Sequence, residues 1–595
     1  MEKLDETKAL LVIIFKDESE WQQYVGILSK LNFAVPFGFN KVECVMLPKN
    51  ENLAAACNFA IKNTDAKYKL FLTKPMVFFD SLLIVSMLDI FFTYPNVGMV
   101  GLFGSEMPIS GDYRQAKSIY GRYYFSQDGQ NMQGYFGKVP LFYQSVHMLD
   151  EGFFAMSGDI LFDEEMGEGF VMAAQCCQYR RAGYDIGVIY YEAVGIIFLE
   201  DRCTYYVKNI DAENYQKQLD IFREKYKDIV TPLVSICIPT YNQPIFCEVA
   251  LQSALTQNYP NIEIIIGDDS TNEDTKIRLE PYLQKYSNIQ YFYHGGTPLR
   301  KKGGSNITFT INKSSGEYIN VLFHDDAIAV DKISRMMDYF ISDLENEIVL
   351  AVSARILINE NNQIISRFNE WQSLNDEILN GEDVGRKILF SKRNFLGELS
   401  TSLIKKSSLL SRDPETGEEI FDIGIFCGVQ DVAYGDIGTW LNLLKYGGKC
   451  VFIKDTLNAF RQHPAQNTYN HSTRVRLMIE FLGYINIAWL NNIYLHNYDE
   501  YKFCLKTWVK FFDMHCPPVA EDESEDIKFL RETMQTARSY IVEEKFPEVL
   551  DCCVSFLLDV LGAKNSIRSL IRSNQKTGLY EKADDGIALH GKQRC

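Results

Sequence analysis

The stretch from Val234 to Asp326 decides the fold. It opens with VSICIPTYNQP (234–244), continues through NIEIIIGDDS (261–270) and closes with GEYINVLFHDDA (316–327). Each segment contains an apolar, β-rich run that ends in a turn, and the last two runs end in the pairs Asp268-Asp269 and Asp325-Asp326. Segments typical of helices, such as PIFCEVALQSALTQ (244–257), lie between the runs. This alternation predicts βαβ units and therefore an α/β fold with a mostly parallel sheet.

The ends of these predicted strands carry acids. In open α/β sheets, ligands bind beyond the carboxyl ends of the strands. The glycine-rich phosphate loop of dinucleotide-binding folds is absent here, since the first run ends in IPTYNQP. Carboxylates suit contacts with a base or a ribose, and they are the ligands that a hard metal ion prefers. The sequence thus predicts an acid-lined ligand site.

The same region resembles the family-2 glycosyltransferases, which have the GT-A nucleotide-sugar fold. The motifs that carry the resemblance span roughly Thr231 to Asn470 and occur in the family's order. They are VSICIPTYN, LTQNYPNIEIIIGDDST, GEYINVLFHDD, GDIGTWLNLLKYGG and RQHPAQN. Each motif alone is weak, but the ordered set is specific.

Composition excludes several classes of protein. A chain of 595 residues should hold more than one domain. Its net charge of −18 argues against nucleic-acid binding and against electrostatic docking to an anionic membrane. The 14 cysteines show no zinc-binding spacing and suit free thiols in a reducing compartment. The N-terminus has the wrong charge for a secretory signal, and residues 81–104 suit a core helix plus a strand. We expect a cytoplasmic protein without a transmembrane segment, at most peripheral at the membrane.

Three regions are predicted. Residues 1–229 form the first, residues 230–470 the catalytic domain, and residues 471–595 a helical region with apolar residues at three-to-four spacing. The helices could cover an acceptor cleft, form a homodimer or dock to a partner. AEDESED (520–526) is expected to be an exposed loop, and the tail after Lys576 to be disordered.

The first region resembles a degenerate copy of the second, which predicts two tandem GT-A-like domains. LAAACNFAIKNTDAKYKLFLTKPMVFF (53–79) matches SNITFTINKSSGEYINVLFHDDA (305–327). However, Thr73-Lys74-Pro75 replaces His324-Asp325-Asp326, and Ala173-Ala174-Gln175 stands where family members usually place an acid. We expect a degenerate, non-catalytic domain that keeps the GT-A shape. An unrelated α/β domain is the alternative.

The resemblance assigns the paired acids to metal and donor binding. Asp326 is expected to ligate Mn²⁺ or Mg²⁺, and Asp325 to face the ribose or sugar. Such an ion would neutralise charge on the leaving diphosphate, and phosphates and water would complete its ligands. The alternative is that both acids only cap a turn. Arg461 and His463, in FRQHPAQN, resemble an element near the diphosphate, where His463 could ligate the metal or bind phosphate. A structural role for His463 remains open.

The expected base site lies at the ends of the first two strands. By the resemblance, Asp269 accepts a hydrogen bond from uracil, and Tyr241 packs against the base beside the Pro239 and Thr240 backbone. Ordinary loop packing is the alternative for Tyr241. Arg300, in GGTPLRKKGGSN, is a candidate for the phosphate oxygens because an arginine fork suits them. Choosing it over Lys301 or Lys302 is arbitrary, and a solvated basic loop is equally compatible.

Asp436 is the expected general base. It lies in VAYGDIGTWLNLLKYGG, which resembles the family's acidic segment, although the preceding family Glu is Gly435 here. Inverting transfer needs a base that takes the proton from the attacking hydroxyl. Asp431 is a competing candidate, and a purely capping role for Asp436 is the alternative.

These residues predict a metal-dependent, inverting glycosyltransferase of the hexosyltransferase type. It would move a sugar from a nucleotide-sugar, most simply a UDP-sugar, to a hydroxyl of a glycan or a glycosylated protein, as in polysaccharide biosynthesis or protein glycosylation. The alternatives are a non-catalytic protein that binds nucleotide-sugars or glycans, and a sugar-phosphate nucleotidyltransferase. The sequence leaves the sugar open, and loops such as residues 395–398 would select it.

Overall fold

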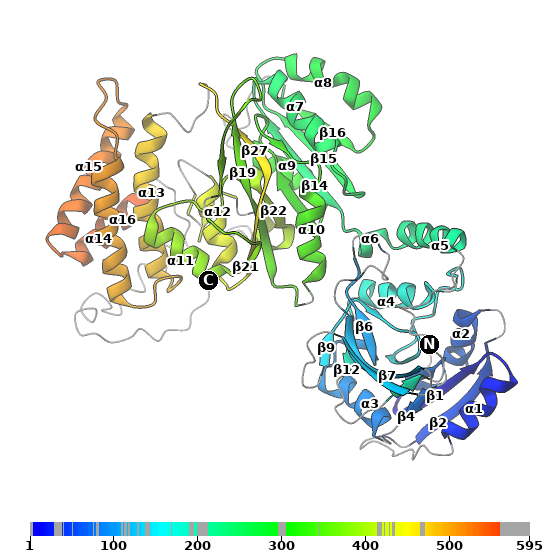
Figure 1. Cartoon of the computed structure of the whole chain (residues 1–595). Coiled ribbons are helices and arrows are strands. Elements are labelled where there is room, and N and C mark those ends of the chain that lie inside the picture. The colour runs from blue at the N-terminus through cyan, green and yellow to red at the C-terminus, as the bar shows by residue number, and fades with distance from the viewer. Residues whose placement is uncertain are drawn as a thin grey trace. The chain divides into compact units, whose positions relative to one another are not determined.

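The computed structural model divides the chain into two compact units (Figure 1). Unit 1 comprises Met1–Pro232 and Phe340–Asn346, and unit 2 comprises Leu233–Tyr339 and Glu347–Cys595. The structure describes residues 4–28, 39, 41–49, 52–74, 76–78, 82–108, 111, 116, 119–127, 130–136, 143–167, 169–189, 196–198, 212–295, 305–343, 345–369, 371–412, 419–421, 423–427, 429–430, 435–464 and 471–559. Arg300, Lys301, Lys302, Asp431 and the tail after Lys576 therefore lie outside the described residues.

Unit 1 is a mixed α/β unit. Its elements, in chain order, are β1 (Asp5–Phe15), α1 (Glu18–Leu28), β2 (Lys41–Pro48), α2 (Leu53–Lys62), β3 (Ala66–Leu72), β4 (Met76–Phe78), α3 (Leu83–Thr93), β5 (Val97–Gly101), β6 (Phe103–Ser105), β7 (Ile119–Gln127), β8 (Gln130–Phe136), β9 (Tyr143–Ser145), β10 (Met148–Leu149), β11 (Phe153–Ser157), α4 (Val171–Arg181), β12 (Asp185–Ile189), β13 (Ile196–Phe198), α5 (Ala212–Lys225) and α6 (Lys227–Val230). Seven strands form its main sheet, in the order β2-β1-β3-β11-β5-β12-β9, and a second sheet has the order β10-β6-β7-β13-β4, with β8 paired to β7.

Unit 2 contains a ten-stranded mixed sheet and the C-terminal helices. Its elements are β14 (Val234–Thr240), α7 (Pro244–Leu255), β15 (Ile262–Asp268), α8 (Asp274–Lys285), β16 (Ile289–Tyr293), α9 (Asn306–Lys313), β17 (Tyr318–Val321), β18 (Ala327–Ile328), α10 (Lys332–Ser342), β19 (Ile348–Ile358), β20 (Ile364–Phe368), β21 (Glu377–Asn380), α11 (Gly381–Ser391), η4 (Leu399–Thr401), β22 (Ser402–Lys405), η5 (Lys406–Leu409), β23 (Leu410–Arg412), β24 (Glu419–Phe421), β25 (Ile425–Phe426), β26 (Val429–Gln430), α12 (Gly435–Leu444), β27 (Lys449–Arg461), α13 (His471–Leu490), α14 (Tyr498–His515), α15 (Glu525–Val542) and α16 (Phe546–Asp559). The sheet order is β16-β15-β14-β17-β22-β19-β27-β18, with β20 on β19 and β21 on β27.

The two main sheets share one topology. In unit 1, β1 runs parallel to β2 and β3, β11 runs antiparallel to β3 and β5, and β5 runs parallel to β12. In unit 2, β14 is parallel to β15 and β17, β22 is antiparallel to β17 and β19, and β19 is parallel to β27. The prediction of two tandem α/β units of related architecture, followed by helices, is confirmed.

Local sequence explains where the helices of unit 2 begin. Pro244 occupies the first turn of α7, where its missing N–H has no helical partner to lose. The side chain of Asn380 accepts from the Glu382 N–H at 2.9 Å and caps α11. Asn497 caps α14 in the same way, through the Glu500 N–H at 3.0 Å. These caps set the residues at which α11 and α14 begin.

Helices cover both faces of the unit 2 sheet (Figure 1). On one side, α7 packs on α8 and lies against β14 and β18. On the other side, one continuous apolar core joins the sheet, α9, α11 and α12 to the C-terminal helices, and it includes Ile265, Ile311, Trp440, Ile485 and Trp508. The C-terminal helices thus use their apolar faces within unit 2. Their proposed part in dimerisation or partner docking stays a prediction.

Within the segment 81–104, the described residues form α3, β5 and the start of β6, so the predicted helix followed by a strand is present. None of the described helices combines the length and apolar composition that crossing a membrane requires. The cysteines of the described part of the chain are all free thiols.

Candidate active site

The ends of β14 and β15 lie side by side. The Asp269 N–H donates to the Thr240 carbonyl at 3.0 Å, and Pro239 pairs with Gly267 in the strand register. Asp268 is buried and accepts from the Ser270 N–H at 2.9 Å and from the Tyr291 hydroxyl. Asp268 therefore holds the turn, while Tyr241 beside it is 37% exposed. The arrangement leaves an aromatic ring accessible at this strand end.

Asp326 is a buried acid that follows the end of β17. It is 1% exposed, its Oδ1 accepts from the Arg461 N–H at 3.1 Å, and its Oδ2 has no hydrogen-bond partner among the residues that the structure describes. Burial raises the pKa of Asp326 well above its ordinary value, and the negative charges of Asp325 and Glu398 raise it further. A buried carboxylate oxygen without a partner is costly, and a cation or a proton would satisfy it.

Arg461 and His463 converge on Asp325. The Arg461 Nε donates to the Asp325 carbonyl at 2.7 Å, and the guanidinium lies 4.6 Å from the centre of the Phe246 ring. The His463 Nε2 lies 3.1 Å from Asp325 Oδ2. The structure thus brings four predicted residues together, but it directs the His463 ring to Asp325 rather than to Asp326.

Lys332 connects the turn that carries Asp326 to the segment around Ser400. Its side chain is buried and its ammonium donates to the Ser400 carbonyl. Burial lowers the pKa of Lys332 to about 7, and the nearby Asp326 partly opposes that shift. The Ser400 hydroxyl accepts from the Phe323 N–H at 3.0 Å. The segment that contains η4 is therefore fastened to the turn that carries Asp326.

Asp436 lies in the first turn of α12. Its Oδ1 accepts from the Ile437 N–H at 2.9 Å, and its Oδ2 accepts from Asn394 Nδ2 at 2.8 Å. Burial and the charge of Glu398 raise the pKa of Asp436 to about 7. A carboxylate with such a pKa is suited to accept a proton near neutral pH.

Glu398 is a site residue that sequence reasoning did not single out. Its carboxylate forms an ion pair with Arg355, with Oε2 at 3.2 Å from Nε, and it influences the pKa of both Asp326 and Asp436. From the sequence, Glu398 was included only as part of the loop 395–398, which was expected to select the sugar. Its partner comes from a different strand, β19, and no local pattern joins the two.

Within the described part of the chain, no three His, Cys, Asp or Glu side chains gather closely enough to hold a metal ion alone. Mg²⁺ is often held by one or two carboxylates together with substrate phosphates. The unpartnered Oδ2 of Asp326 fits that kind of site. The residues present are therefore compatible with a metal that arrives with the donor.

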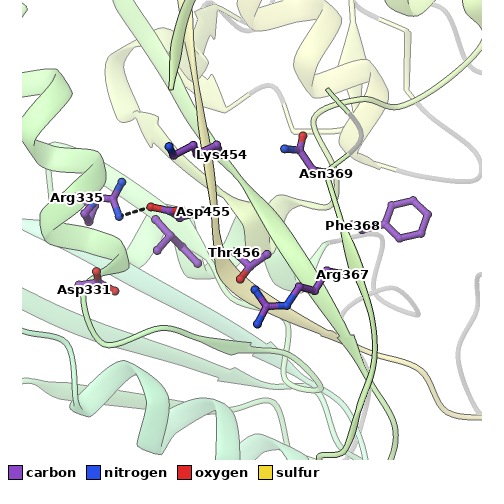
Figure 2. A pocket seen from close by; sticks show the side chains of 9 residues that line it. Asp331, Arg335, Arg367, Phe368, Asn369, Lys454, Asp455 and Thr456 are labelled. Atoms are coloured by element: carbon purple, nitrogen blue, oxygen red, sulfur yellow. Dashed lines mark hydrogen bonds and ion pairs between the residues drawn. The ribbon is translucent and has the colours of Figure 1, made fainter. Parts of the chain in front are cut away.

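A separate hollow of about 450 Å³ lies on unit 2 (Figure 2). An ion pair between Arg335 and Asp455, at 2.9 Å, borders it. Its lining residues are Asp331, Arg335, Arg367, Phe368, Asn369, Lys454, Asp455, Thr456 and Leu457. None of them belongs to the acid site, so the hollow and the candidate active site are different features.

Unit 1 lacks the acids at the matching places. After β3, Lys74 lies 3.2 Å from Glu151, so a cation stands where acids follow β17 in unit 2. The first turn of α4 has no acidic residue, whereas the first turn of α12 has Asp436. Gln175 donates to the Ile160 carbonyl at 2.7 Å and packs in the core.

Comparison with known proteins identifies the family. A model described as "Glycosyltransferase like family" matches residues 10–226, and one described as "Glycosyl transferase family 2" matches residues 235–398. The chain belongs to the family-2 glycosyltransferases, with two glycosyltransferase domains in tandem.

Individual relatives match only parts of the chain. An uncharacterised glycosyltransferase of Rickettsia typhi is 36% identical over 22% of this chain and 38% of its own length, so the match spans less than half of that relative. A GalNAc(5)-diNAcBac-PP-undecaprenol beta-1,3-glucosyltransferase of Campylobacter jejuni is 24% identical over 48% of this chain and 81% of its own length. The crystal structure of S. aureus TarS 1–349 with UDP-GlcNAc is 13% identical, covers 55% of this chain and 91% of that chain, and has a TM-score of 0.36.

Proposed function

We propose that unit 2 catalyses metal-assisted, inverting transfer of a hexose from a UDP-sugar to a hydroxyl group of a glycan or a glycosylated protein. One observation carries the proposal: just beyond the carboxyl ends of parallel strands, Asp326 buries a carboxylate oxygen that has no hydrogen-bond partner within the described part of the chain. That is where ligands bind in open α/β sheets.

Asp326 would hold the metal, with His463 as a second candidate ligand once it leaves Asp325. Bound by these residues, Mg²⁺ or Mn²⁺ would supply charge neutralisation for the leaving diphosphate. Asp325 would face the ribose or the sugar. Arg461, whose Nε is fixed on the Asp325 carbonyl at 2.7 Å, would place its positive charge beside the diphosphate. Arg300 remains a further candidate for phosphate binding.

Asp436 would act as the general base. A carboxylate can take the proton of the acceptor hydroxyl as that oxygen attacks the anomeric carbon, while the diphosphate leaves from the opposite face. The hydrogen bonds from Asn394 and Ile437 orient the two oxygens of this carboxylate. The raised pKa of about 7 gives it the proton affinity that the step needs.

The nucleotide base would lie at the ends of β14 and β15. Asp269 would accept from the uracil ring, the exposed Tyr241 would pack against the base, and the Pro239 and Thr240 backbone would border it. The hydrogen bond from the Asp269 N–H to Thr240 holds these two strand ends together. This arrangement supports a pyrimidine-sized site.

The acceptor is proposed from the relatives. The Campylobacter relative is named as a glucosyltransferase that acts on a lipid-linked glycan, and another relative, of Escherichia coli, is named chondroitin synthase. Both names support a glycan acceptor. Free thiols and the net charge of −18 favour a cytoplasmic setting, at most peripheral at a membrane.

A donor screen tests the function directly. Purified full-length protein would be mixed with UDP-glucose, UDP-galactose, UDP-GlcNAc, UDP-GalNAc and GDP-mannose, with Mn²⁺ or with EDTA. We expect a UDP-sugar to raise the melting temperature with Mn²⁺ and to release UDP slowly by hydrolysis. Absence of stabilisation and of turnover with every donor would contradict the proposal.

A further inference from the structure

The loop that carries Glu398 is fastened on the side of the proposed base. Gly397 has φ of +86°, a conformation that favours glycine. Its carbonyl accepts from Asn394 Nδ2 at 2.9 Å and from Trp440 Nε1 at 3.1 Å. The same Asn394 amide group donates to Asp436. The backbone before Glu398 and the proposed base therefore share one anchor.

The same loop is fastened on the side of the proposed metal ligand. Two residues after Glu398, the Ser400 hydroxyl accepts from the Phe323 N–H at 3.0 Å, in the turn that leads to Asp326. The Glu398 carbonyl accepts from the Thr401 hydroxyl at 2.7 Å. Glu398 thus stands on a rigid segment that joins the Asp326 turn to Asp436.

The Glu398 side chain is held as well. Its carboxylate is paired with Arg355 at 3.2 Å, and the two side chains are 19% and 11% exposed. The Arg355 guanidinium also lies 5.5 Å from the centre of the Phe368 ring. An acid that is mostly withdrawn from water, with a fixed cation beside it, presents hydrogen-bond acceptors in a defined direction.

The chemistry of transfer fixes where the sugar must lie. The diphosphate leaves on the Asp326 side, and the acceptor hydroxyl arrives on the Asp436 side, so the sugar ring occupies the space between them. We propose that Glu398, oriented by Arg355, is the residue that recognises the donor sugar by accepting hydrogen bonds from its hydroxyl groups. This inference rests on the proposed function. It assigns a residue that contacts the sugar of the donor and does not contact its nucleotide.

Such a contact has a specific energetic signature. A buried acceptor that loses its hydroxyl partner is left unsatisfied, so a site built in this way discriminates strongly against analogues that lack the hydroxyl. UDP without a sugar never makes the contact. Loss of the Glu398 carboxylate should therefore weaken the binding of a UDP-sugar and spare that of UDP.

Calorimetric titration of the full-length protein with Mn²⁺ tests this prediction. The probes are UDP and the tightest binder among UDP-glucose, UDP-galactose, UDP-GlcNAc and UDP-GalNAc. In Glu398→Gln we expect the affinity for the UDP-sugar to fall roughly ten- to a hundredfold, with the affinity for UDP unchanged. Arg355→Met should cause a loss in the same direction, since it releases the carboxylate. Glu532→Gln, an exposed position on α15, is the matched control.

Each result has a separate meaning. If UDP and the UDP-sugar weaken equally in Glu398→Gln, the residue has only a structural role and the inference is overturned. Unchanged affinities for both probes overturn it as well. If the wild-type protein binds neither probe, the proposed function itself fails. Should Glu398→Gln not fold by circular dichroism, Glu398→Asp gives the same test because it withdraws the carboxylate by one methylene while keeping its charge.

Discussion

The side-chain amide of Asn394 donates to the Asp436 carboxylate at 2.8 Å. Asn394 precedes β22 and Asp436 lies in the first turn of α12, so the bond links the segment before β22 to the start of that helix. It holds one oxygen of Asp436 while the Ile437 N–H holds the other. The acid is therefore positioned before any substrate arrives, as general-base catalysis requires.

Asp436→Asn should separate the role of base from that of helix cap. Asparagine caps a helix about as well as aspartate but cannot take a proton. We expect a folded protein that binds UDP with Mn²⁺ normally and transfers sugar about a hundred- to ten-thousandfold more slowly. Single-turnover rates and calorimetric affinities check this. Wild-type turnover would remove the role of base and make Asp431 the next candidate.

The pH dependence of transfer should follow Asp436. Burial and Glu398 raise its pKa to about 7, and only the ionised form accepts a proton. The rate of the chemical step should therefore rise as the pH increases through about 7 and then level off. A pH-rate profile measured at saturating donor checks this, and a rate that is constant between pH 5.5 and 8.5 would contradict it.

Stability should show the opposite trend at the same residue. Because the folded-state pKa of Asp436 lies above its ordinary value of 3.8, the folded protein binds more protons than the unfolded chain between these values. The stabilisation is complete below about pH 4 and is lost as the pH rises through about 7. Asp436→Asn should flatten this part of the profile of melting temperature against pH. An equal slope in both proteins would argue against the raised pKa.

Metal dependence should centre on Asp326. EDTA should abolish transfer, and Mn²⁺ or Mg²⁺ should restore it. Asp326→Asn should fold, lose most of its activity and no longer gain UDP affinity from Mn²⁺, because the buried oxygen that would meet the cation becomes part of an amide. Glu280→Gln, exposed on α8, is the control. Full, metal-stimulated activity in Asp326→Asn would refute the assignment.

Competition between nucleotides should reveal the base site. Asp269 beside Thr240 suits the hydrogen-bond donor of a uracil ring, so UDP should compete with the donor better than GDP does. Asp269→Asn should reduce that preference with little effect on stability. Inhibition constants for both nucleotides provide the measurement, and equal competition by UDP and GDP in the wild-type protein would refute the base contact.

Unit 1 should fold without being an enzyme. It has its own apolar cores, with Phe71, Phe154 and Leu70 among their members, and an ion pair of Lys74 in place of the strand-end acids. A fragment of residues 1–232 should melt cooperatively but show neither sugar transfer nor Mn²⁺-dependent UDP binding. Turnover by this fragment would refute the assignment of unit 1 as a degenerate domain.

Sequence patterns predicted the parts of the fold that depend on local periodicity. The βαβ alternation from Val234 to Asp326 and the four C-terminal helices are visible because burial repeats along each element. The shared topology of the units was also predictable, from the match of residues 53–79 to residues 305–327. The convergence of Asp325, Arg461 and His463 followed from the resemblance rather than from any local pattern.

Side-chain pairs between residues far apart in the chain could not be predicted from the sequence. Glu398 and Arg355 come from separate elements, and nothing near either residue indicates the other. The acidic stretch 520–526 was expected to be an exposed loop, which is wrong at two places: Glu525 and Asp526 form the first turn of α15, and Glu523 is not exposed. That side chain is buried, with Arg531 Nε at 2.8 Å and His471 Nε2 at 2.7 Å from its Oε1. A run of charged residues is normally exposed to solvent. Here Arg531, two turns into α15, pairs with Glu523, and this pairing allows the Glu523 side chain to be buried.

The strand-pairing scheme that the two main sheets share has a consequence for biogenesis. Two copies of one pairing scheme in a single polypeptide can exchange strands, and such misassembly is a characteristic failure of tandem repeats. Here the equivalent first strands, ALLVIIF (9–15) and VSICIPT (234–240), differ at most positions. On the ribosome the earlier copy emerges first and can fold before the later copy is complete. We therefore expect the divergence of the two copies to limit strand exchange while the chain folds.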